Sequence, residues 1–266
     1  MKSYRDTFEK SIIGEITQGS IFNGAISKLY LDKKIEGLVI TPRCDIAQKK
    51  VSEYYYLPIV NYKDWLEVEF PALFLSKLKK DTYGKLRKCL RLHGVSDSIL
   101  NIYNSIKVRQ LAGNVIGEKI PKDLNQLFNK LSDIELIDSN IEKAKEYYEK
   151  YTSIKKSILD EIISNKNSNF YVIENEKDVF VIRIRELRRL TNSMLFKLAS
   201  GIEHPLSEEE LKENDIRQLE EGDIYYPIFT IKSPYIEHIV QHFMQQFNRI
   251  GVEDMCDATI KRIKDF

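Results

Sequence analysis

Apolar positions divide the chain into three parts, and the first, residues 15–62, is typical of β-strands. Residues 37–40 form a short β-branched run that stops at Thr41-Pro42, as a buried strand does. Residues 54–60 form a second run, and Pro58 near its end predicts that this strand ends at a sheet edge. Residues 18–22 predict a turn that enters a further strand.

The middle part, residues 63–165, has helical spacing. An amphipathic pattern covers residues 70–92 and closes at Gly94, and another begins at Pro121. Apolar residues spaced three and four apart continue over residues 141–162, behind Ser139 as a helix cap, and predict one long helix. We expect a packed structural helix rather than a coiled-coil seam, because the pattern lasts only about three heptads.

The third part returns to strands and ends in a helix. Residues 170–174 and 179–187 flank a polar turn and predict a hairpin, and residues 224–231 predict another strand. Ser233-Pro234 then favours a helix start, with serine as the N-cap and proline in the first helical position. We expect this helix to reach residues 249–250, with Gly251 as its C-cap.

These patterns predict an α+β fold. Strands from residues 15–62 and 166–266 would form one barrel-like sheet that carries the C-terminal helix, and residues 63–165 would form a helical insertion.

Composition supports a folded chain and excludes several classes of protein. The 266 residues are 42% hydrophobic and 30% charged, which is too apolar for a disordered chain. Lysine plus arginine is 41 and aspartate plus glutamate is 40, so the whole surface is not that of a basic nucleic-acid binder. Charge is nevertheless segregated locally, with a basic stretch at 77–91 and an acidic one at 208–221.

The three cysteines, Cys44, Cys89 and Cys256, form no CxxC pair and predict neither a disulfide framework nor a zinc finger. A cytoplasmic protein is expected, since the polar N-terminus lacks the apolar core of a signal peptide and no apolar run is long enough for a bilayer. Walker, GxGxxG, GxSxG and DFG-like motifs are absent from the sequence, and we expect no cofactor.

The first candidate site follows the strand at 37–40, where Arg43, Cys44 and Asp45 stand together. A cation beside a thiol lowers the thiol pKa, as a nucleophile or metal ligand requires. The alternative is a structural turn, with a small buried Cys44 and with Asp45 as the cap of a short helix.

The second candidate site is a polar stripe on the C-terminal helix, formed by Glu237, His238, Gln241 and His242. The two histidines lie one turn apart and have the spacing of metal ligands, although no HExxH motif surrounds them. Three interpretations stay open: a solvated or packed face, a polar ligand or catalytic site that uses His238, and a thiol or metal site joining Cys44 to both histidines.

A third candidate is the basic face of residues 77–91. Its predicted nucleic-acid-binding residues are Lys77, Lys80, Lys85, Arg87, Lys88 and Arg91. Such a run contacts phosphates in some proteins and is a solvated helix face in more of them. The arginines of residues 183–189 form a second basic cluster, which we expect to pair internally with the acids of 208–221.

The β segments resemble the MazF/PemK toxin family. Residues 18–22 (Gln-Gly-Ser-Ile-Phe), 37–41 (Gly-Leu-Val-Ile-Thr) and 55–59 (Tyr-Tyr-Leu-Pro-Ile) are similar to its opening strands, and residues 181–187 are similar to a later strand. The resemblance implies a small SH3-like barrel and sequence-specific endoribonuclease activity. Lys34-Ile35-Glu36 stands where the family has Arg-Pro, and Val60 stands where it has threonine or serine.

Two functional hypotheses follow. The first is a non-catalytic interaction protein of a bacterial multi-component system, of a phage-defence or toxin–antitoxin-like kind, which binds a partner protein encoded nearby, or nucleic acid, through the helical insertion. The second is a nuclease that uses Arg43, Asp45, Arg185 or His238. The resemblance implies that members of this family cleave RNA with a hydroxyl and an arginine near the scissile phosphate. Both groups are absent at the matching positions here, which favours the first hypothesis.

Overall fold

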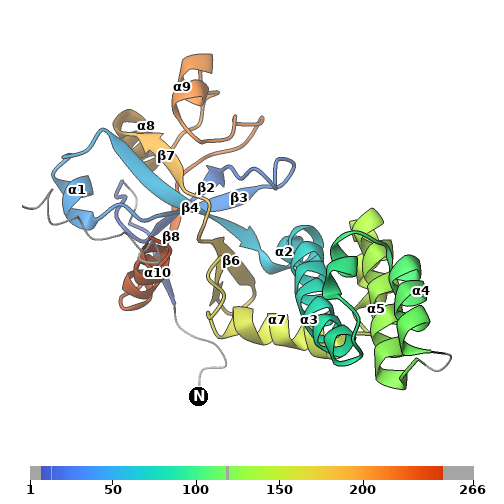
Figure 1. Ribbon diagram of the computed structural model, residues 1–266. Helices are drawn as coiled ribbons and strands as arrows, with labels where there is room; N and C mark the ends of the chain where they lie inside the picture. The colour runs from blue at the N-terminus through green and yellow to red at the C-terminus, as the bar shows by residue number, and fades with distance from the viewer. Residues whose placement is uncertain (1–6, 13, 118–119, 248–266) are drawn as a thin grey trace, which may run out of the picture. The chain divides into compact units, whose positions relative to one another are not determined.

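The computed structural model describes residues 7–12, 14–117 and 120–247, and it has an α+β fold (Figure 1). The chain forms two compact units. Of the described residues, the β unit contains 7–12, 14–59, 168–176 and 182–247, and the helical unit contains 60–117, 120–167 and 177–181. We describe each unit by itself.

A strongly curled antiparallel sheet is the framework of the β unit, although the end of β4 (residues 60–61) and the start of β6 (residues 179–181) are assigned to the helical unit. The order of its strands is β1-β8-β2-β3-β4-β6-β5, with β7 also paired to β4. The strands are β1 (Phe8–Lys10), β2 (Ser20–Ala25), β3 (Ile35–Val39), β4 (Glu53–Asn61), β5 (Phe170–Glu174), β6 (Val179–Arg183), β7 (Arg188–Thr191) and β8 (Pro227–Ile231).

Close packing at the centre of the sheet explains why the sequence has glycine at position 37. Gly37 on β3 is in register with Phe22 on β2 and with Pro58 on β4. The Phe22 and Tyr56 rings meet edge to face with centroids 5.1 Å apart, and a Cβ at Gly37 would lie 2.5 Å from the Phe22 ring. Any larger residue would push these buried rings apart.

The strands predicted at 18–22, 37–40 and 54–60 are confirmed, but three details of the predicted strands were wrong. Pro58 does not mark a sheet edge, because β4 has neighbours on both sides. The part of β4 that pairs with β7 runs from Glu53 to Tyr56, and Pro58 lies two residues beyond this paired part. The predicted strand at 224–231 begins only at Pro227, and β6 ends at Arg183 rather than at residue 187.

Helices α1 (Arg43–Ala47), α8 (Asn192–Ser200), α9 (Glu208–Glu213) and α10 (Tyr235–Met244) also belong to the β unit. The predicted start of the last helix was wrong: Pro234 occupies the N-cap position, so Ser233 is not the cap and the helix begins at Tyr235. The predicted end at 249–250 was also wrong, because α10 ends at Met244, and the predicted cap Gly251 lies outside the described residues.

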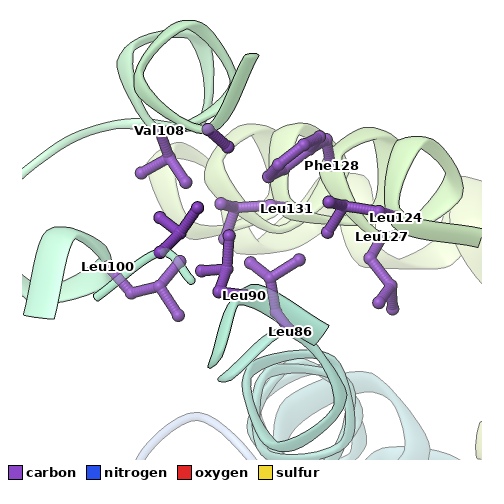
Figure 2. Close-up of a cluster of buried hydrophobic side chains, with 10 residues drawn as sticks. Leu86, Leu90, Leu100, Val108, Leu124, Leu127, Phe128 and Leu131 are labelled. Carbon is purple, nitrogen blue, oxygen red and sulfur yellow. The ribbon is translucent and has the colours of Figure 1, made fainter. Parts of the chain in front are cut away.

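The helical unit is built on α3 and α5. Its helical segments are α2 (Tyr62–Val68), α3 (Phe70–Leu92), η1 (Asp97–Asn101), α4 (Ser105–Ile116), α5 (Lys122–Ser139), η2 (Ile141–Lys143), α6 (Ala144–Tyr147) and α7 (Thr152–Ile163). Leu86 and Leu90 of α3, Val108 of α4 and Phe128 of α5 share one buried cluster (Figure 2). The predicted helix at 70–92 is confirmed to the residue.

The single long helix predicted over 141–162 was wrong, because the chain breaks there into η2, α6 and α7. Asn140 is extended and its side chain accepts a hydrogen bond from the Glu142 amide, which starts a new segment. Tyr151 also leaves the helical conformation, and its hydroxyl donates to buried Asp133 on α5. These contacts outweigh the local apolar periodicity.

Across the described ranges, no helix combines the length and hydropathy that crossing a bilayer requires.

Candidate functional sites

The Arg43-Cys44-Asp45 segment is an exposed helix end. It opens α1 directly after Pro42, and no side chain caps this helix, so the predicted Asp45 cap was wrong. Cys44 is exposed rather than buried, and its thiol lies 3.6 Å from an Asp45 carboxylate oxygen. The segment therefore presents a cation, a thiol and a carboxylate to solvent.

The polar stripe of α10 packs on a buried tyrosine of β5. Nδ1 of His238 is 2.8 Å from the hydroxyl of Tyr171, which is 2% exposed. The His242 ring also meets Tyr171 edge to face, with centroids 5.9 Å apart, and His242 is buried. The same tyrosine therefore organises both histidines, while His238 and Gln241 keep an exposed surface.

Two predicted arginines lie along the same helix. The Arg43 guanidinium is 3.8 Å from the Glu237 carboxylate, which brings the first turn of α1 to the first turn of α10. At the other end of α10, Nε of Arg185 donates to Oε1 of Gln246 at 3.2 Å. Residues from three separate sequence segments thus gather around α10.

This arrangement has defined chemical possibilities. Tyr171 binds one ring nitrogen of the exposed His238, so the other nitrogen is left for a ligand or a proton. Arg43 and Arg185 supply positive charge near the two ends of the helix. Within the ranges that the structure describes, no group of three histidine, cysteine or acidic side chains has a metal-binding arrangement.

An ion network around Glu186 was not predicted as such. Glu186 pairs with Arg183 and Arg188, and its carboxylate also accepts from the Ser27 hydroxyl at 2.6 Å. All three charged side chains are only 12–13% exposed. Arg188 also pairs with Asp215 at 3.2 Å, which fits the expected pairing of this arginine cluster with the acids of 208–221.

A cleft of about 570 Å³ between α8 and the segment leading into α9 was also not predicted. Phe196, Lys197, His204 and Glu210 are among its lining residues. Lys197 pairs with Glu210, and the Ser207 amide and hydroxyl donate to the same carboxylate. These donors lower the pKa of Glu210 to about 2.

On α3 the six predicted nucleic-acid-binding residues fall into two groups. Lys77 pairs with Glu161, Lys85 with Asp81 and Arg91 with Asp97, so intramolecular carboxylates already neutralise these three. Lys80, Arg87 and Lys88 are exposed and pair with no carboxylate among the described residues.

Exposed aliphatic side chains follow this basic stretch in the sequence, and they were missed at the sequence level. Leu92 at the end of α3 is 83% exposed, Ile102 after η1 is 69% exposed and Ile106 in α4 is 76% exposed. Tyr103 between them is 44% exposed. The sequence could have indicated that these side chains are exposed, because Leu92 and Ile106 fall outside the apolar stripes of their own helices.

Comparison with known proteins returns no matching family model, no matching curated protein and no matching solved structure.

Proposed function

We propose that this protein is an interaction module, which binds a partner protein of a bacterial multi-component system through its helical unit. The observation that carries the proposal is a set of exposed side chains in one stretch of the chain, Leu92, Ile102, Tyr103 and Ile106, which we call the apolar patch. Within 15 residues of sequence, three aliphatic side chains are more than two-thirds exposed. Aliphatic surface held in water is unfavourable by about 25 cal/mol per Å², and its burial by a partner recovers that free energy.

Co-purification from the native host tests the proposal. The wild-type chain is compared with a variant carrying Leu92→Ser, Ile102→Ser and Ile106→Ser, and with a control carrying Leu31→Ser. Leu31 is 73% exposed and belongs to the β unit, so it matches the patch in exposure and chemistry.

We expect a companion protein in similar amounts with the wild type and the control, and at least about tenfold less with the triple variant. Absence of any companion, or equal recovery with all three chains, would contradict the proposal.

A second candidate function is nucleic-acid cleavage at α10. The observation that favours it is the hydrogen bond that fixes exposed His238 on buried Tyr171, with Arg43 reaching the same helix. In that proposal the curled sheet is an SH3-like barrel of the MazF/PemK kind, His238 moves a proton, and Arg43 and Arg185 stabilise phosphate charge.

The test is to incubate the purified chain with RNA and with DNA and to compare His238→Ala, Arg43→Ala and the control Lys145→Ala. Cleavage that falls at least about a hundredfold in His238→Ala and persists in the control supports this candidate. No cleavage, or unchanged cleavage in both site variants, removes it.

A further inference from the structure

We infer that the apolar patch and its basic border bind an acidic amphipathic segment of a partner protein. This inference rests on the proposed function and adds the chemistry of the partner. Three observations support it: how firmly the patch is anchored, how exposed it is, and which charges surround it.

The segment that carries the patch is held by buried contacts. Val95 belongs to the buried cluster of the helical unit. Leu100 belongs to it as well, together with Leu90 and Val108 (Figure 2). At the start of α4, the amide and the hydroxyl of buried Ser105 each donate to the Glu135 carboxylate at 2.6 Å.

Side-chain caps also fix this segment at the starts of η1 and α4. Ser96 caps η1, and the Asn104 side chain accepts from the Lys107 amide at 3.0 Å. A backbone fixed in this way loses little conformational entropy when a partner binds, so more of the burial energy appears as affinity.

Basic residues predominate in the stretch of chain that carries the patch. Residues 77–116 contain nine lysines and arginines against two acids, Asp81 and Asp97. Both acids are engaged, by Lys85 and Arg91. The basic residues left without a carboxylate in the described part of the chain are Lys80, Arg87, Lys88, Lys107 and Arg109.

Two of these residues border the patch directly by helical spacing. Lys88 lies one turn before Leu92 on α3, and Arg109 lies three residues after Ile106 on α4. A partner that covers the patch therefore meets positive charge at its edges. Acidic residues flanking an apolar stripe are the complementary arrangement.

A protein partner fits this surface better than a nucleic acid does. Nucleic acids are bound through phosphate contacts and by stacking of bases on aromatic rings. Leu92, Ile102 and Ile106 offer neither, and only Tyr103 has a ring to stack. The aliphatic majority of the patch gains free energy only from apolar side chains.

The experiment measures binding of defined probes to the purified full chain by fluorescence anisotropy. The first probe is an acidic amphipathic peptide of about 20 residues, with leucines at i, i+3, i+4 and i+7 and glutamates between them. The others are a scrambled peptide of the same composition, the same amphipathic peptide with lysine for glutamate, and a single-stranded RNA of about 20 nucleotides.

We expect the acidic amphipathic peptide to bind at least about tenfold more tightly than each of the other three probes. Its affinity should fall about tenfold in the triple variant and in Lys88→Glu/Arg109→Glu. It should be unchanged in Leu31→Ser and in Lys145→Glu, which alters an exposed lysine of α6.

Equal binding of the scrambled peptide, tighter binding of the RNA, or no binding of the acidic peptide overturns the inference. These failures are distinct from failure of the proposed function. A companion protein that depends on the patch in co-purification, together with any of these results, rejects the acidic amphipathic chemistry and retains the interaction module.

Discussion

At the scale of residues, the Glu186 network joins distant sequence positions by charge rather than by apolar packing. Glu186 receives hydrogen bonds from Ser27, the Lys28 amide and Arg188, and it pairs with Arg183. Removing one member of such a buried network leaves the opposite charges without compensation, which costs more than the pair itself contributes.

Glu186→Gln is therefore expected to lower the free energy of unfolding by about 3 to 5 kcal/mol. The matched control is Glu53→Gln, which breaks the exposed Glu53–Arg189 pair and should cost about 1 kcal/mol or less. Urea unfolding followed by circular dichroism measures both. Equal effects of the two substitutions would show that the Glu186 network does not hold the β unit together.

Two leucines of α3 test the division between core and patch. Leu90 is fully buried in the helical cluster, and Leu92 two residues later is 83% exposed. Leu90→Ala should cost about 2 to 5 kcal/mol, because it leaves a cavity, and Leu92→Ala should change stability by about 0.5 kcal/mol or less. Trp65, the single tryptophan, lies in the helical unit and reports its unfolding by fluorescence. A large cost for Leu92→Ala would contradict the assignment of Leu92 to the patch.

At the scale of elements, a capping box starts α9, and a lysine that lines the neighbouring cleft pairs with the glutamate of that box. Ser207 and Glu210 satisfy each other's backbone amides, and Lys197 from α8 pairs with the same glutamate. Because these donors favour the carboxylate, the pKa of Glu210 is lowered to about 2.

The contribution of Glu210 to stability is therefore fully present above the pKa of a free glutamate, about 4.3, and is lost as pH falls toward 2. Carboxyl NMR titration should give a Glu210 pKa near 2, and Lys197→Met should raise it toward the ordinary value. An unchanged pKa in Lys197→Met would show that the lysine is not the main cause.

Elements also show what sequence patterns can predict. The helix at 70–92 could be predicted from its own apolar stripe, and residues at the end of this stripe pack into the buried cluster. The segment at 141–162 has an equally regular stripe, but Asn140 and Tyr151 find partners that local periodicity does not include. The gathering of Arg43, Tyr171 and Arg185 around α10 depends on the tertiary fold, which no spacing within one segment specifies.

At the scale of the whole molecule, the nearly equal numbers of basic and acidic residues conceal an uneven distribution. Much of the local charge is paired inside its own unit, as for Lys77 with Glu161 and Arg188 with Asp215. The surplus that remains over 77–116 is basic and lies beside exposed aliphatic side chains. This combination was not evident from net charge, and it is the basis of the proposed interaction.

Site-specific photocrosslinking in the native host tests the interaction most directly. A benzophenone amino acid replaces Ile106 in one chain and Leu31 in the control, and mass spectrometry identifies the crosslinked partner. The account predicts that position 106 crosslinks to one protein, at a segment with acidic and apolar residues in helical spacing, and that position 31 does not. Crosslinks to nucleic acid, crosslinks to many unrelated proteins, or the same products from both positions would contradict it.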